Sequence, residues 1–208
     1  LPYALEETRH GEATANAVFD RFADMRPAIN VRLVAQSALP KISILTPVFN
    51  PPEAMLRQML DSVLAQVYPN WQLCIVDDAS TAPHVMSILR EYAAREKRIK
   101  LVFLTRNSGV SKATNHALKM ADGQFVVLLD HDDMLEEQAL FRVAESVLAD
   151  DPDMLYSDER LVGEDGTTVL HSLFRPMFSL EYLRSHPYIV HMIGFKTRFL
   201  RALGGLDE

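Results

Sequence analysis

The chain has 208 residues, a formal net charge of −7 and a single cysteine. Its acidic excess, with Lys and Arg scattered along the chain, gives no basic stripe for a phosphodiester backbone, which argues against nucleic acid as a main partner. Cys74 lies alone in an apolar run, which excludes a disulfide framework and a cysteine-based metal site and favours a reducing compartment.

The sequence contains no run that approaches the roughly 18 apolar residues of a membrane span. Its first ten residues have neither the basic start nor the apolar core of a signal peptide. We therefore expect a cytoplasmic location, with peripheral attachment to the inner face of the membrane as a further option. The chain starts without Met and stops inside what reads as the middle of a motif, so we expect a fragment of a longer protein.

Residues 1–40 are expected to form a partly helical N-terminal extension, with a short helix at residues 15–23. From Lys41 onwards, short apolar runs alternate with segments that carry apolar residues at helical spacing. The expected strands are 42–45, 73–76, 100–104 and 125–129, and the expected helices are 53–66, 84–94, 109–120 and one that starts near Leu135. This alternation favours one α/β domain over residues 41–208, with a central, mostly parallel sheet flanked by helices.

A polar cluster follows each of the first four expected strands. These clusters are residues 46–50, 77–80, 106–112 and 130–133. Because ligands of open α/β sheets bind beyond the carboxyl ends of the strands, we expect the four clusters to meet along one rim.

The fourth cluster contains Asp130, His131, Asp132 and Asp133. Three carboxylates so close together repel one another unless a cation or a set of donors compensates, and Mg²⁺ or Mn²⁺ prefers such oxygen ligands. The alternative is that these aspartates cap the helix near Leu135, a role that we expect for Asp133. Strand alternation predicts that His131 points away from the metal.

Two other clusters offer groups for a nucleotide. Asp78, at the end of its strand, could accept a hydrogen bond from a base; alternatively, the segment forms an Asx-turn before a helix that starts near Pro83, which Asp78, Ser80 and Thr81 could provide. Gly109 permits close backbone approach, and Lys112 adds positive charge where a helix N-terminus already favours phosphate. The alternative for Lys112 is a solvated surface side chain.

Five segments in this order resemble glycosyltransferase family two. They are residues 46–50, 64–71, 76–80, 107–115 and 128–133. The resemblance covers about residues 41–208, and five ordered motifs at family-like spacing are far more specific than any one of them.

The resemblance implies a GT-A type, Rossmann-like fold and an inverting transfer from a nucleoside-diphosphate sugar to a hydroxyl acceptor. It implies that a UDP-sugar is the favoured donor, that a saccharide or lipid-linked molecule is the acceptor, and that the product belongs to a surface polysaccharide or glycoconjugate. The implied nucleotide-binding residues are Pro47, Val48, Phe49, Asp78, Gly109, Lys112 and Asp130. Asp132, with Asp130 beside it, would bind Mn²⁺ or Mg²⁺.

The catalytic base of similar enzymes lies downstream of a segment like residues 204–208, so the resemblance implies a base beyond Glu208. Asp158 and Glu159 match a segment near the donor or acceptor. His191 matches a position that faces the cleft, although a lone histidine in an apolar run is more often a core residue. Tyr68 and Trp71 are expected to be packing residues.

Three other classes share parts of this pattern. A phospho-receiver domain needs a carboxylate at the end of the third strand, where residues 104–107 have none, and a haloacid-dehalogenase-like phosphatase needs a nucleophile after its first strand, where Thr46 and Pro47 stand. Both fail on strand position. A non-catalytic nucleotide-sugar-binding module remains open as the alternative to an enzyme.

Overall fold

The computed structural model describes residues 39–208. The predicted N-terminal extension, with its expected helix at residues 15–23, lies outside the described residues except for Leu39 and Pro40. The described part of the chain forms two compact units. The larger contains residues 39–156 and 192–208, and the smaller is Ser157–His191.

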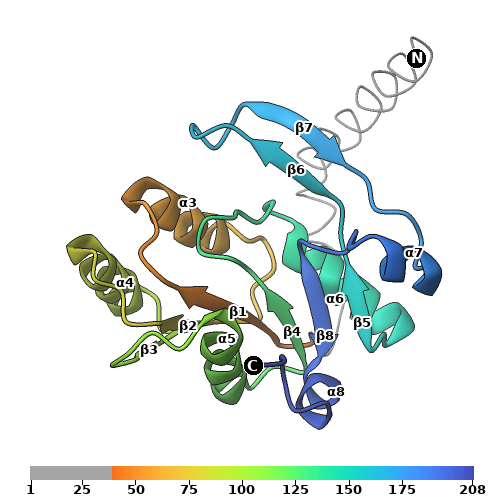
Figure 1. Ribbon diagram of the computed structural model, residues 1–208, viewed down its shortest axis with the longest axis horizontal. Helices are drawn as coiled ribbons and strands as arrows, with labels where there is room; N and C mark the ends of the chain where they lie inside the picture. The colour runs from red at the N-terminus through yellow and green to blue at the C-terminus, as the bar shows by residue number, and fades with distance from the viewer. Residues whose placement is uncertain (1–38) are drawn as a thin grey trace. The chain divides into compact units, whose positions relative to one another are not determined.

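The larger unit contains six strands and their connecting helices (Figure 1). In chain order these are β1 (Ile42–Val48), α3 (Glu53–Leu64), β2 (Trp71–Asp77), α4 (Pro83–Arg95), β3 (Ile99–Phe103), α5 (Val110–Met120), β4 (Phe125–Leu128), α6 (Ala139–Asp150), β5 (Met154–Tyr156), β8 (Ile193–Lys196) and α8 (Thr197–Ala202). The four strands predicted from the apolar runs are all present, as β1, β2, β3 and β4. Every residue of β1 and β2 is buried, as expected of strands covered on both faces.

The sheet order is β3-β2-β1-β4-β8-β5. Strands β1 to β4 pair in parallel, whereas β8 runs antiparallel to both β4 and β5. The prediction of a mostly parallel sheet is therefore confirmed. The antiparallel strand was not predicted, because its four residues form only part of an apolar run whose direction no local signal fixes.

The chain changes direction across the sheet after β3. It moves outwards from β1 through β2 to β3 and then returns past β1 to β4. Right-handed crossovers therefore place α3 and α4 on one face of the sheet and α5 on the other. The point between β1 and β4, where the order reverses, is the position at which open α/β sheets bind ligands.

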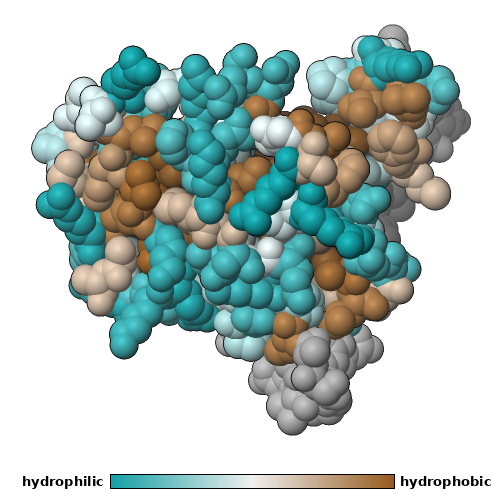
Figure 2. All heavy atoms as spheres, turned by 90° about the horizontal axis from the view of Figure 1, so that it is seen from below, coloured by the Kyte–Doolittle hydropathy of each residue, from teal (hydrophilic) through white to brown (hydrophobic). Residues whose placement is uncertain are grey.

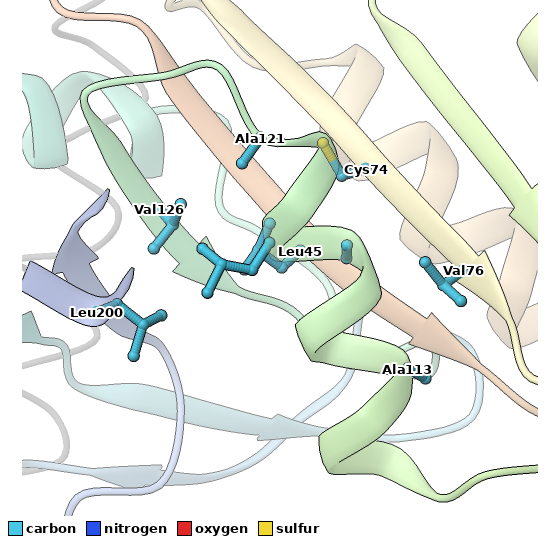
Figure 3. Close-up of a cluster of buried hydrophobic side chains, with 9 residues drawn as sticks. Leu45, Cys74, Val76, Ala113, Ala121, Val126 and Leu200 are labelled. Carbon is cyan, nitrogen blue, oxygen red and sulfur yellow. The ribbon is translucent and has the colours of Figure 1, made fainter. Parts of the chain in front are cut away.

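Helix α5 packs closely on β1 and β2, as Figure 3 shows. Leu45, Cys74 and Val76 point from the two strands into a fully buried cluster with Ala113 of the helix. Small alanine side chains let the helix approach the sheet, and dense packing holds it rigidly. This packing places the first turn of α5 near the carboxyl ends of the strands.

Helix α6 begins at Ala139, so the expected start near Leu135 is wrong. The side chain of Gln66, which follows α3, binds the start of α6. Its Oε1 accepts from Leu140 N at 3.0 Å, and its Nε2 donates to Glu136 O at 2.8 Å. The role predicted for Asp133 as a helix cap is therefore also wrong. An amide from a distant segment satisfies a first-turn N–H that a local cap would otherwise bind.

The smaller unit contains a two-stranded antiparallel sheet and one short helix. These are β6 (Glu159–Val162), β7 (Val169–Leu173) and α7 (Leu180–Ser185). Ser179 caps α7, because its Oγ accepts from Tyr182 N at 3.2 Å. The rings of Tyr182 and Tyr188 stack with their centroids 4.8 Å apart.

On the face drawn in Figure 2, hydrophilic and hydrophobic residues are interspersed. Some large apolar side chains, such as Leu148 and Leu203, are exposed. None of the helices within residues 39–208 is long and apolar enough to cross a membrane.

Candidate nucleotide-binding site

A cavity of about 520 Å³ lies at the reversal of the strand order. Its volume is in the range of small-molecule sites. The residues that line it come from three strand ends and from the start of α5: Pro47, Val48, Phe49, Asp78, Asn107, Gly109, Val110, Ala113, Asp130, His131 and Asp132. Of the residues predicted to bind nucleotide, all except Lys112 line this cavity.

Asp78 is buried, and its carboxylate binds the backbone of the loop that precedes α5. Ser108 N donates to both carboxylate oxygens, at 2.8 and 3.0 Å, and Gly109 N donates to Oδ2 at 2.8 Å. A charged acceptor makes stronger hydrogen bonds than a neutral one. Asp78 therefore holds the loop at the rim of the cavity, and the base contact predicted for it remains a prediction.

Asp77 Oδ1 accepts from Ser80 N, three residues further on, at 3.4 Å. The Asp78 carboxylate, from which an Asx-turn was the alternative expectation, binds residues 108 and 109 instead. The following turn, before α4, depends on Asn50, which the sequence placed in the rim cluster 46–50 without indicating this contact. Asn50 Oδ1 accepts from Thr81 N at 2.8 Å and from Ala82 N at 2.9 Å. This asparagine links the loop after β1 to the loop after β2, and so fixes two sides of the rim together.

Gly109 precedes α5 with φ +90° and ψ 160°, a backbone conformation that residues with a side chain rarely adopt. As the N-cap residue, Gly109 has no side chain that could accept from the first-turn N–H groups. The N–H groups of the first turn therefore remain available on the side where Gly109 and Val110 line the cavity. Such a helix N-terminus favours an anionic ligand.

The acidic cluster follows β4 at the opposite side of the same cavity. Asp130, His131 and Asp132 all line it, with Asp132 exposed and Asp130 half-buried. We predicted from strand alternation that His131 points away from the metal, but β4 ends at Leu128, so strand alternation does not extend to His131. The imidazole Nδ1 lies 3.2 Å from Pro47 O, and this contact connects the acidic cluster to the end of β1.

Lys112 lies in the first turn of α5, but its ammonium group forms an ion pair rather than lining the cavity. Its Nζ is 3.7 Å from Glu208 Oε2, and both side chains are about half exposed. The position near the diphosphate predicted for Lys112 remains a prediction.

Asp158, Glu159 and His191 belong to the smaller unit. Within that unit Asp158 Oδ1 accepts from Arg175 N at 2.7 Å, and Glu159 forms an ion pair with the Arg175 guanidinium. Arg175 carried no sequence signal, because the pairing depends on a turn between distant residues. The donor or acceptor roles predicted for Asp158, Glu159 and His191 remain predictions.

Tyr68 and Trp71 are fully buried, which confirms that they are packing residues. Tyr68 Oη donates to Pro40 O at 2.6 Å, and the Arg98 guanidinium lies 3.7 Å from the centroid of the Trp71 ring. Burial raises the pKa of the Tyr68 hydroxyl to about 12. Asn107 and Val110 line the cavity as members of the cluster 106–112 expected at the rim, although no individual role was predicted for either.

The protein is an open α/β sheet with a cavity at the reversal of its strand order, the position at which such sheets bind ligands. Residues 43–203 match the family model described as Glycosyl transferase family 2. The chain belongs to this family.

Relatives and solved structures agree with this assignment. The chain is 40% identical over 170 residues, 81% of its length, to the uncharacterized protein y4gI of Sinorhizobium fredii, and 40% identical over 174 residues, 83% of its length, to the O-antigen biosynthesis protein RfbC of Myxococcus xanthus. It spans only 19% and 14% of these two proteins. S. aureus TarS 1-349, solved with UDP and with UDP-GlcNAc, is 27% and 28% identical with TM-scores of 0.63 and 0.62. Both matches cover 79% of this chain, and they cover 49% and 47% of the TarS chains; the predicted GT-A type α/β fold is confirmed.

Proposed function

We propose that residues 41–208 form a glycosyltransferase domain that moves a sugar, with inversion, from a UDP-sugar to a hydroxyl of a saccharide or lipid-linked acceptor. The product would be a surface polysaccharide or glycoconjugate. The observation that carries the proposal is the cavity at the reversal of the strand order, which is lined by every residue predicted to bind nucleotide or metal except Lys112. The UDP and UDP-GlcNAc in the TarS structures support the choice of donor.

The nucleotide would occupy the cavity with its base near residues 47–49 and its diphosphate near the start of α5. Phe49 lines the cavity and is 44% exposed, so its ring is accessible for stacking on a base. The first-turn N–H groups of α5 would donate to the phosphates, and Gly109 allows them a close approach.

The acidic residues fit a divalent cation, because Asp130 and Asp132 line the same cavity and offer only oxygen ligands. Members of family 2 generally use divalent cations. Asp132 would bind Mn²⁺ or Mg²⁺ directly, and Asp130 would bind the ribose or a metal-bound water. The ion would supply positive charge that stabilises the departing diphosphate.

The residues of the chain would complete this stabilisation. The α5 N-terminus and Lys112 would neutralise the charge that develops on the leaving diphosphate. Asp78 would keep the loop before α5 in place during the reaction, through its three backbone hydrogen bonds. The acceptor hydroxyl would lose its proton to a carboxylate base, predicted beyond Glu208, as it attacks the anomeric carbon from the opposite face.

The test is thermal unfolding with UDP, with and without Mn²⁺, for the wild type and Asp132→Ala. At about 100 times its dissociation constant, a ligand stabilises the folded state by about 2.7 kcal/mol. For a chain of this size we expect an increase in Tm of roughly 5–10 °C in the wild type. Asp132→Ala should lose the part of the increase that depends on Mn²⁺.

Asp122→Ala is the matched control, because it removes another exposed carboxylate, whose ion pair with Lys41 does not contribute to the cavity. Equal Mn²⁺-dependent shifts in Asp132→Ala and the wild type would contradict the metal assignment. Release of UDP from a UDP-sugar by the full-length protein separates a transferase from a binding module, since a module binds the donor without turning it over.

A further inference from the structure

Residues 204–208, at the blue end of the chain in Figure 1, lie beside α5 and are bound to it by one buried side chain. Asn115 Oδ1 accepts from Leu206 N at 2.8 Å, and Asn115 Nδ2 donates to Leu206 O at 2.9 Å. The amide therefore pairs with both polar groups of one backbone residue, as a neighbouring β-strand would. This pairing fixes the loop to the middle of the helix.

Gly205 shows how closely the loop approaches. A Cβ atom at this position would lie 2.3 Å from Asn115 Oδ1, and the backbone has φ +90°. Both the space and the conformation therefore require glycine at residue 205.

The same amide also contacts the carboxylate of Glu208. Asn115 Nδ2 donates to Glu208 Oε1 at 3.2 Å, while the other oxygen, Oε2, lies 3.7 Å from Lys112 Nζ. Asn115 and Lys112 are three residues apart on α5 and so lie on one side of the helix. Glu208 therefore bridges a buried amide and the ammonium group in the first turn of α5.

We propose that Asn115 is a positioning residue that holds Glu208 against Lys112, so that Glu208 is the counter-ion which the diphosphate of the donor must replace. This inference rests on the proposed function, because it takes the start of α5 as the phosphate site. An exposed ion pair is weak, so it can exchange one anionic partner for another at small cost. Lys112 then neutralises Glu208 before the donor binds and the diphosphate afterwards.

The experiment titrates UDP in the presence of Mn²⁺, at low ionic strength, into the wild type, Glu208→Gln, Lys112→Met and the double variant. Glu208→Gln keeps an oxygen that can accept from Asn115 but removes the charge. We expect it to lower the dissociation constant of UDP by about threefold, the order of effect of one charge several ångströms away. In the Lys112→Met background the same change should have a clearly smaller effect. An equal effect in both backgrounds would overturn the proposal, because Glu208 would then act by direct repulsion alone.

Asn115→Ala should tighten UDP binding in the same direction, because it releases Glu208 from Lys112. Asn70→Ala is its matched control: it removes an amide that donates to Leu39 O at 2.7 Å, next to the amino end of β2 and away from the cavity. We expect it to leave UDP affinity unchanged. Uridine, which has no phosphate, should bind all variants alike, and an unequal response to uridine would contradict a role through the diphosphate.

A second measurement needs no nucleotide. Reductive methylation of Lys112, followed by peptide mass spectrometry, should be at least about twofold faster in Glu208→Gln and Asn115→Ala than in the wild type, because an ion pair protects an amine. Equal rates would overturn the role of Glu208 as counter-ion. Failure of the wild type to bind UDP would instead contradict the proposed function, and the methylation rates would still test the ion pair.

Discussion

Substitution of Asp78 by asparagine tests whether this carboxylate holds the loop before α5 or serves only as a ligand for a base. The change keeps the size of the side chain and replaces one acceptor oxygen with an NH₂ donor. Whichever way the amide is oriented, its NH₂ group faces a backbone N–H at the position of a present hydrogen bond, from Ser108 or from Gly109.

The magnitude follows from these contacts. At least one of the three hydrogen bonds is lost, and the others lose the strengthening of a charged acceptor, to which a hydrogen bond contributes about 1.5–3 kcal/mol. We expect the free energy of unfolding to fall by about 2–3 kcal/mol and Tm to fall by roughly 4–12 °C.

The assay is urea unfolding without ligand, extrapolated to zero denaturant. The neighbouring variant Asp77→Asn is the control. Asp77 is equally buried, but its carboxylate makes only the 3.4 Å contact with Ser80 N among the hydrogen bonds of the described residues, and asparagine can still accept it. We expect a loss below about 1 kcal/mol there. If both variants lost the same free energy, or if Asp78→Asn lowered UDP affinity alone, the reasoning about the loop would be refuted.

Two further predictions concern buried groups away from the cavity. Burial raises the pKa of the Tyr68 hydroxyl to about 12, so its neutral form contributes stability that is present below pH 10 and is lost as the pH rises through 12. Tyr68→Phe should lower the free energy of unfolding by about 1 kcal/mol at pH 7, because the hydrogen bond to Pro40 O is lost, and should flatten the decline in stability between pH 10 and 12. An unchanged decline would contradict this. Burial, with a smaller effect of Asp122, likewise raises the pKa of the Cys74 thiol to about 12. At pH 8, iodoacetamide should therefore label Cys74 at least about a hundredfold faster in urea-unfolded protein than in native protein. Comparable labelling rates would show that the thiol is accessible in the native protein.

The sequence predicted the parallel part of the sheet because that part is determined by local composition. Ile42–Val48 and Trp71–Asp77 are apolar over most of their length and are buried throughout. The amphipathic spacing of residues 53–66 and 109–120 also located α3 and α5. Because polar residues directly follow such strands, the position of the cavity could be predicted from chain order alone.

The contacts that shape the rim could not be predicted in the same way, because they join residues far apart in the chain. Asn50 binds the turn at residues 81–82, Asp78 binds residues 108–109, and Asn115 binds Leu206. In each case the local sequence is also compatible with an ordinary surface polar residue. The pattern identified which loops meet but not which side chains hold them together.

Lys112 illustrates what this difference means for function. Its place in the first turn of α5 was predicted from helix spacing, and a phosphate role was then inferred from charge. The fold adds Glu208, 96 positions further along the chain, as a partner that competes for the same ammonium group. A cation that already has a weak counter-ion is held in place before the donor arrives and can exchange that partner for a more highly charged one. The affinity of the site for a diphosphate should therefore depend on the loop at residues 204–208 as well as on the residues that line the cavity.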